Sequence, residues 1–141
     1  MEPKLILYPL LAMVALTFIV AVVMFRRRVA TLKANRIHPQ KVATSGQLGV
    51  LIEDSRASDN FRNLFETPML FYVAMITIYA TGLICTAHLL FAWAYVLTRC
   101  LHSYLQCTAN IVMRRFYAFL ASGIFLLFTW LMLGYQLVSM N

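Results

Sequence analysis

Long apolar runs separated by short charged segments are the dominant pattern of this 141-residue chain. Residues 5–25 form a run of 21 uncharged residues, and residues 116–141 form a run of 26. The 51 residues between Arg62 and Arg114 contain a further stretch, 67–98, without Lys, Arg, Asp or Glu. A bilayer core of roughly 30 Å takes about 20 apolar residues per helix, so this middle region fits two helices and a tight turn. The pattern predicts four transmembrane helices, at about 5–28, 59–81, 86–110 and 113–138.

The composition changes this picture little. Hydrophobic residues make up 62% of the chain and the mean hydropathy is +0.75, far above the values of soluble globular proteins. The first apolar run is too long for the core of a cleaved signal peptide, and Arg26, Arg27 and Arg28 follow it as an anchor. We therefore expect an all-α membrane protein, a single four-helix transmembrane bundle over residues 1–141 with one long loop at about 29–57.

The basic residues indicate an orientation in the membrane. The chain has 12 Lys and Arg against 5 Asp and Glu, and ten of those twelve lie either between residues 26 and 62 or at Arg114 and Arg115. Such clusters beside apolar helices follow the positive-inside rule and do not indicate nucleic-acid binding. We expect both basic loops to be cytoplasmic and in contact with anionic lipids, and both termini to lie outside.

Polar side chains share one face of the third predicted helix. At 100° per residue, five of them fall within about 60° of one another on a helix that is otherwise apolar. On the fourth predicted helix a polar residue recurs every seven positions from Arg115 to Gln136. Such faces must lie inside the protein because lipid cannot solvate them. The five residues on the third helix are His88, Tyr95, Arg99, His102 and Gln106.

Glu66 is expected to pair with a buried arginine, Arg99 above all, either directly or through one water, in the same or a neighbouring subunit. Arg99 lies about ten residues from the cytoplasmic end of its helix, roughly 15 Å deep, where exposure to lipid costs at least about 2.5 kcal/mol. Apart from Asp59 at the start of the second span, Glu66 is the only carboxylate in any predicted span. The pair could act only as a structural lock between helices, or it could belong to a binding site. Breaking a buried pair costs about 3 to 5 kcal/mol.

Several polar residues converge on the cytoplasmic halves of the helices, next to the basic loop. A pocket with this lining suits an anionic ligand that makes many hydrogen bonds, and a single four-helix bundle is too thin to screen it from lipid. Association of several copies would supply the missing wall. The converging residues are Arg62, Asn63, Glu66, Arg99, His102, Gln106 and Arg115.

Other kinds of site have no sequence support. Cys85, Cys100 and Cys107 form no CxxC pair and no zinc spacing, and we interpret them as small packing residues. The chain has no Gly-rich phosphate loop and no Ser-His-Asp arrangement. A small multidrug transporter could also have four short spans and one membrane glutamate. The position of Glu66 beside Arg62 and the long basic loop argue against it.

The segment FRNLFETP at 61–68 resembles the helix-two signature of the MAPEG family, the membrane-associated proteins in eicosanoid and glutathione metabolism. RCLHSYLQ at 99–106, followed by Arg115, resembles the second signature of that family. Length, four spans and the basic first loop are similar as well, so the resemblance covers essentially the whole chain. It implies a bacterial-type member in the inner membrane, a homotrimer that binds glutathione between subunits near the cytoplasmic face.

The resemblance also implies roles for individual residues. Arg115 corresponds to the arginine that stabilises the glutathione thiolate, and a nearby cation lowers the pKa of a thiol. Two positions differ from the family pattern, Gln106 where many members carry tyrosine and Phe116 where the prostaglandin synthases often carry serine. The implied glutathione ligands are Arg27 at the end of helix one, Arg62, Asn63, Glu66, Arg99, His102 and Gln106.

Two functions follow from the resemblance. The first is a glutathione transferase or glutathione-dependent peroxidase that acts on a lipophilic electrophile arriving from the bilayer. The second is a non-catalytic relative that serves as a scaffold or as an accessory subunit of a larger membrane complex. Glutathione binding and turnover of a generic electrophile distinguish the two.

Overall fold

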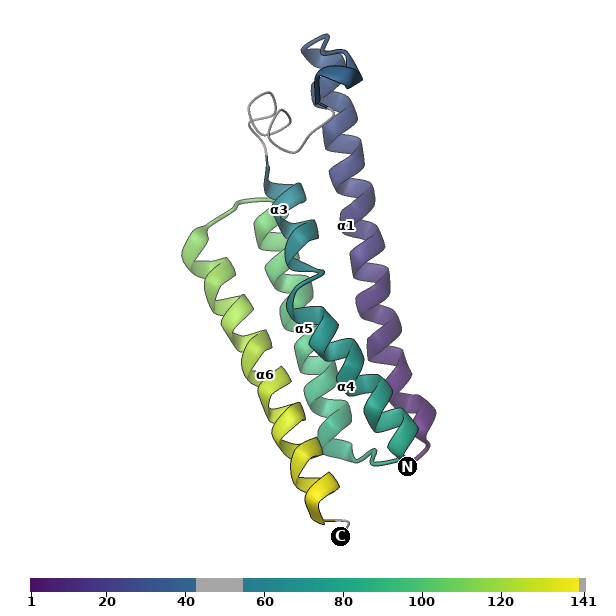
Figure 1. The fold of residues 1–141 in the computed structure, drawn as a ribbon. Coiled ribbons are helices and arrows are strands. Elements are labelled where there is room, and N and C mark those ends of the chain that lie inside the picture. The colour runs from purple at the N-terminus through teal and green to yellow at the C-terminus, as the bar shows by residue number, and fades with distance from the viewer. Residues whose placement is uncertain (43–54, 140–141) are drawn as a thin grey trace.

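The computed structural model describes residues 1–42 and 55–139, and within them every regular element is helical. Helices α1, α4, α5 and α6 lie side by side, and α3 continues the line of α4 (Figure 1). The N-terminus and the end of α6 lie at one end of the bundle, while the end of α1 and the α5–α6 turn lie at the other (Figure 1). The elements are η1 Pro3–Ile6, α1 Leu7–Ala34, η2 Pro39–Val42, α3 Arg56–Asn63, α4 Thr67–Thr81, α5 Thr86–Cys107 and α6 Val112–Ser139.

Three segments in the described residues are long and apolar enough to cross a membrane, namely Pro3–Ala34, Arg56–Thr81 and Val112–Ser139. Helix α5 is not among them, because its polar face lowers its hydropathy. Its 22 residues still span roughly 33 Å, close to the thickness of a bilayer core. The fourth crossing therefore stays a prediction that depends on the burial of that polar face.

Helix α1 is longer than the sequence pattern predicts. It continues to Ala34, six residues beyond the expected end at 28, so the first part of the expected loop is helical. Loss of hydrophobicity ends a membrane span but does not end a helix, and residues 29–34 contain no Gly or Pro. The helix stops at Asn35, and Arg36 follows in a left-handed conformation with φ of 52°. The remaining loop lies mostly in residues 43–54, outside the described residues.

The second predicted helix is interrupted, which corrects the expectation of one continuous span at 59–81. Helix α3 ends at Asn63 and α4 begins at Thr67, with Leu64, Phe65 and Glu66 in turns between them. Pro68 explains the break, because it has no N–H for the Leu64 carbonyl and its ring clashes with that carbonyl in a regular helix. Helix α4 ends at Gly82, whose φ of 69° suits glycine, and the turn to α5 follows.

The polar face predicted for α5 is buried in the bundle, as expected. His88, Tyr95 and Arg99 have no exposed surface, and His102 and Gln106 are 4% and 2% exposed. Helix α5 packs most extensively on α6, where Ser122 and Thr129 of the predicted seven-residue repeat are also buried. α5 ends at Cys107, three residues before the expected boundary. Beyond it, Asn110 adopts a left-handed φ of 50° in the turn to α6.

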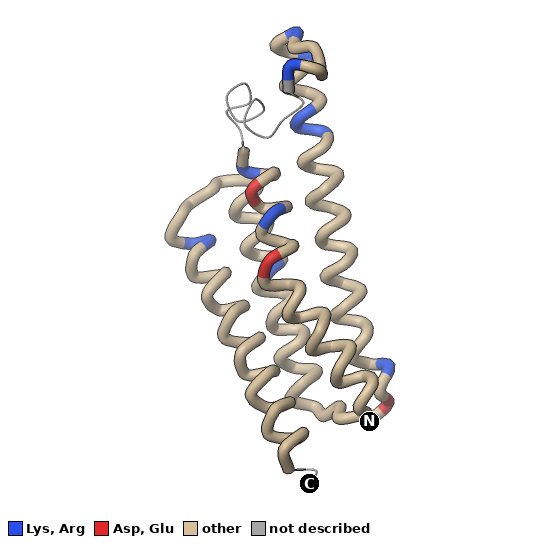
Figure 2. The backbone as a smooth tube through the Cα atoms, in the orientation of Figure 1, with Lys and Arg blue, Asp and Glu red and all other residues tan. Residues whose placement is uncertain are grey.

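Charged residues gather at the end of the bundle that contains the α5–α6 turn (Figure 2). The exceptions are Glu2 and Lys4 at the opposite end, which form an ion pair of 3.5 Å with each other. Apolar residues form the core between these ends, with Phe71, Met75 and Ile78 of α4 fully buried in a cluster that also includes residues of α1, α5 and α6. The fold thus places most of its charged groups at one end of the bundle (Figure 2).

Candidate binding site

The break before α4 supplies the main contact of Arg99. In a continuous helix the Asn63 carbonyl would accept the backbone N–H of residue 67. Here that carbonyl accepts a hydrogen bond of 2.8 Å from Nη2 of Arg99 instead. The proline in NLFETP therefore interrupts the backbone hydrogen bonds of the helix and leaves the Asn63 carbonyl free to accept from Arg99.

Arg99 is a fully buried cation whose hydrogen bonds are incomplete. Its side chain has 0% exposed surface, and neither Nε nor Nη1 has a hydrogen-bond partner in the described part of the chain. The guanidinium lies over the Phe119 ring, with Cζ 5.5 Å from the ring centroid, which provides a cation–π contact. A buried guanidinium normally has its donors satisfied. The arrangement therefore leaves two donor nitrogen atoms of Arg99 without a hydrogen-bond partner among the described residues.

The expected partner, Glu66, does not form this ion pair within one chain. The two side chains make no salt bridge, and Glu66 is exposed on the outside of the bundle. Arg62 is exposed as well, one helical turn away. Within one chain this salt bridge is absent, because the interruption at residues 64–66 turns Glu66 outward while Asn63 stays against α5. A contact between Glu66 of one subunit and Arg99 of a neighbour stays a prediction.

His102 links α5 to the start of α6. Its Nδ1 donates to the carbonyl oxygen of Arg115 at 2.9 Å, and its Nε2 lies 2.8 Å from Oε1 of Gln106. The same Oε1 accepts a hydrogen bond of 3.3 Å from the Asn63 amide. Three of the predicted ligands, from α3 and α5, thus form one connected network.

This network can accommodate a change in the charge of His102. A carbonyl only accepts, so the contact with Arg115 keeps a proton on Nδ1. An amide can accept from Nε2–H of a charged ring, or after a half-turn it can donate to Nε2 of a neutral ring. Gln106 can therefore hydrogen-bond to the imidazole in either charge state. A tyrosine at this position would contact the ring through a single hydroxyl instead.

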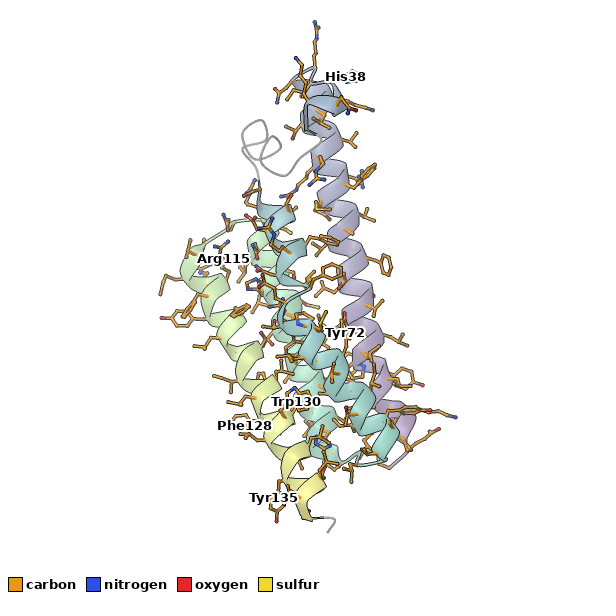
Figure 3. All side chains as sticks on the ribbon, in the orientation of Figure 1. His38, Tyr72, Arg115, Phe128, Trp130 and Tyr135 are labelled. Carbon is orange, nitrogen blue, oxygen red and sulfur yellow. The ribbon has the colours of Figure 1, made fainter. Side chains whose placement is uncertain are left out.

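Arg115 lies at the beginning of α6, close to the α5–α6 turn (Figure 3). Its side chain is half-buried, and Nη1 donates to Oδ1 of Asn110 at 2.8 Å. Asn is one of the few residues that adopt a left-handed conformation at low cost, so Asn110 both closes the turn and orients the arginine. The adjacent Arg114 is exposed.

Arg27 contacts the last carbonyls of α5. Its Nη2 donates to the Cys107 carbonyl at 2.6 Å, and Arg56 donates to the Thr108 carbonyl at 2.8 Å. Cations at the C-terminal end of a helix are favoured by the helix dipole. Two arginines from α1 and α3 thus fix the C-terminal end of α5, and Arg27 lies at the polar end of the bundle.

The sequence interpretation missed Asn60. It is fully buried, its amide lies 3.4 Å from Sγ of Cys107, and its Oδ1 accepts a hydrogen bond of 3.2 Å from the Ser103 hydroxyl. Its position three residues before Asn63 places both amides on one face of α3, a signal that the sequence already contained. Asn60 thus locks α3 to α5 and holds Asn63 in register with Gln106.

An apolar groove runs along the outside of the bundle between α4 and α6. It has a volume of about 560 Å³ and is lined by Thr67, Leu70, Gly123, Leu126, Leu127 and Trp130. Trp130 lies about midway along α6 in Figure 3. Gly123 contributes no side chain to the groove, and an added Cβ would meet no atom within 4 Å. Because Thr67 directly follows Glu66, one end of the groove reaches the polar end of the bundle.

The structure thus divides the predicted ligands into three groups. Asn63, Arg99, His102 and Gln106 come together inside the bundle. Arg62 and Glu66 lie on its outer surface. Arg27 and Arg115 fix the ends of helices at the edge of the same region. The interior group offers unused donors next to a buried positive charge, which is suited to binding a carboxylate.

A model of the MAPEG family, the family that the two sequence signatures resemble, matches residues 6–135. No curated protein and no solved structure matches the chain.

Proposed function

The chain belongs to the MAPEG family, and from this premise we propose that it is a glutathione-binding integral membrane protein that acts as a transferase or peroxidase on lipophilic electrophiles. The observation that carries the proposal is Arg99, a fully buried guanidinium with two nitrogen atoms that make no hydrogen bond. Retaining an unpaired buried cation costs several kcal/mol, so its presence calls for an anion. Glutathione has two carboxylates, and its ammonium suits a carboxylate such as Glu66.

The exposed charges support assembly as a homotrimer with the ligand between subunits. Arg62 and Glu66 lie on a surface that also exposes Phe65, Met69 and Leu70. A charge that faces lipid costs at least about 2.5 kcal/mol, whereas a neighbouring subunit can cover it and supply partners. In this assembly Arg62 and Glu66 of one subunit would face a neighbour, and glutathione would complete the contacts of both.

Arg115 is our candidate for stabilising the thiolate. Its guanidinium is held at the inner end of the bundle by Asn110, next to the backbone carbonyl that His102 contacts. A fixed cation beside sulfur favours the thiolate, which is the reactive nucleophile. Arg27, Asn63, His102 and Gln106 would position the tripeptide around it.

The groove between α4 and α6 supports a lipophilic second substrate. Its lining is almost entirely apolar, it opens on the surface that we expect to face lipid, and it ends at Thr67 beside the polar region. An electrophile dissolved in the bilayer could therefore reach the sulfur without crossing water. We also propose that the basic loops are cytoplasmic and that both termini lie outside. A reporter fused to the C-terminus should therefore give an external signal.

Calorimetry with detergent-purified protein tests the proposal most directly. We expect reduced glutathione and S-methylglutathione both to bind, and reduced glutathione to be conjugated to a generic aromatic electrophile. Arg115→Ala should abolish the ultraviolet thiolate absorbance and retain S-methylglutathione binding. Its matched control, Arg114→Ala, should behave like the parent.

The other outcomes separate the alternatives. Binding without turnover would favour the scaffold or accessory subunit, a role consistent with Gln106 in place of tyrosine. Failure to bind at millimolar glutathione would overturn the proposed ligand. Native mass spectrometry that shows only monomers or dimers would overturn the trimer.

A further inference from the structure

Three side chains with soft donor atoms meet at the end of the bundle opposite the candidate binding site. Cys85 precedes α5, His88 lies in its first turn, and Met132 belongs to α6. Sγ of Cys85 is 3.5 Å from Nδ1 of His88 and 3.9 Å from Sδ of Met132. The thiol of Cys85 thus contacts both an imidazole of its own helix and a thioether that lies 47 positions away in the sequence.

The two separations from Sγ of Cys85 are compatible with ligands of one three-coordinate metal ion. Metal–nitrogen and metal–sulfur bonds are roughly 2.0 to 2.3 Å long, and donors at the corners of a planar triangle then lie roughly 3.5 to 4.0 Å apart. Both measured separations fall in that range.

His88 provides an independent indication. The imidazole is fully buried in an otherwise apolar region, its Nδ1 donates to the Leu83 carbonyl at 3.1 Å, and its Nε2 has no partner. A buried polar residue that only links a turn to its own helix is a costly way to close that turn. Transfer of the ring proton from Nδ1 to Nε2, at the cost of the hydrogen bond to the Leu83 carbonyl, would free the nitrogen nearest Cys85 for an ion.

The donor set selects the class of metal. Within the described residues no three His, Cys, Asp or Glu side chains are grouped so as to hold an ion, which argues against a conventional zinc site here. The third donor is a thioether, which hard and borderline ions bind weakly and soft monovalent ions bind well. Thiolate, thioether and imidazole together suit Cu(I) and its analogue Ag(I).

We propose that Cys85, His88 and Met132 form a three-coordinate site for a soft monovalent ion, Cu(I) or Ag(I). The ion replaces the thiol proton of Cys85, which is released to solvent, while the imidazole stays neutral by moving its proton to Nε2. Cys85 and Met132 are only half-buried, which gives the ion a route to the site. Neither glutathione nor the residues of the candidate binding site take part, so this proposal is independent of the proposed function.

Anaerobic Cu(I) titration against a chromophoric chelator tests the site, using the full-length protein in detergent without glutathione. We expect one ion per chain and X-ray absorption that reports two sulfur ligands and one nitrogen. Cys85→Ser should weaken binding by at least about a hundredfold, the upper end of the loss caused by removing a residue that merely orients a ligand. Zn(II) should not compete.

Matched variants keep the test decisive. Met132→Leu preserves volume and should still fold, so a tenfold or greater loss of Cu(I) affinity would identify the thioether as a ligand. Cys100→Ser, which removes another half-buried cysteine from α5, should bind like the parent. Binding that is unchanged in Met132→Leu, or that is lost in Cys100→Ser, would overturn the site. Absence of binding in the parent would show that the cluster is ordinary packing.

Discussion

The two halves of α5 are buried by different kinds of interaction. The outer region is a close-packed apolar core, formed by Phe71, Met75 and Ile78 of α4 with Ala92 and Tyr95 of α5. In it, the rings of Phe71 and Tyr95 stack with centroids 4.4 Å apart. The inner region consists instead of hydrogen bonds from α5 to α3 and α6. Its members are Asn60, Asn63, Arg99, His102 and Gln106.

This difference indicates which region maintains the fold and which is adapted to a ligand. Every side chain of the outer region is satisfied by packing alone except for the Tyr95 hydroxyl, which has no hydrogen-bond partner. The inner region keeps a cation with unused donors, which stability alone would not select. We therefore expect substitutions in the outer region to change stability, and substitutions in the inner region to change glutathione binding more than stability.

Arg99→Met should give the largest effect on binding. It removes two charge-assisted contacts to the ligand, so glutathione affinity should fall by about a hundredfold or more. Stability without glutathione should equal or exceed that of the parent, because a buried charge without a carboxylate partner is replaced by an apolar side chain. Calorimetry and thermal unfolding in detergent measure the two properties. A variant that loses stability and still binds glutathione would reverse the roles we assign to the two regions.

Phe71→Ala should give the opposite result. Removal of a fully buried ring that stacks on Tyr95 should lower the free energy of unfolding by about 3 kcal/mol. The glutathione affinity of the folded fraction should change less than about threefold, since Phe71 lies outside the hydrogen-bond network. Chemical denaturation and ligand titration check both values. A large loss of affinity at full occupancy of the folded state would show that the regions are coupled.

Gln106→Leu should affect both properties moderately. The amide contacts His102 and Asn63, and its loss leaves those buried groups without partners at a cost of about 1 to 3 kcal/mol. Glutathione affinity should fall about tenfold as His102 loses its orientation. Gln136→Leu is the matched control, because Oε1 of Gln136 is buried and makes no hydrogen bond, so this change should be neutral or stabilising. Equal losses of glutathione affinity and of stability in the two variants would contradict the role of the hydrogen-bond network.

Pro68→Ala should give the smallest effect. The new N–H can bond the Leu64 carbonyl and favour a continuous helix through residues 63–67, which competes for the Asn63 carbonyl that Arg99 uses. We expect glutathione affinity to fall severalfold and stability to change by less than about 1 kcal/mol. Amide hydrogen exchange around residues 64–68 should slow in this variant. Pro9→Ala in α1, far from this contact, serves as the control and should leave both affinity and exchange unchanged.

Much of the fold follows from local periodicity. The polar face of α5 and the seven-residue repeat of α6 could be identified because residues on one side of a helix recur at fixed intervals, whatever packs against them. Arg99 was expected to be buried for the same reason, and its side chain has no exposed surface. The break before α4 could also have been predicted from Pro68, but the length of the apolar run favoured one span over the local effect of proline.

The sequence by itself determined that the chain forms apolar helices, which residues share a helical face, and which family it belongs to, because these properties depend on residue order alone. Only the tertiary structure decided that Arg99 bonds the Asn63 carbonyl and not Glu66, that Asn60 locks α3 to α5, and that Cys85 meets Met132. Such pairings depend on how far each helix extends and how it is rotated against its neighbours. The packing of the whole bundle sets those quantities, and no single segment encodes them.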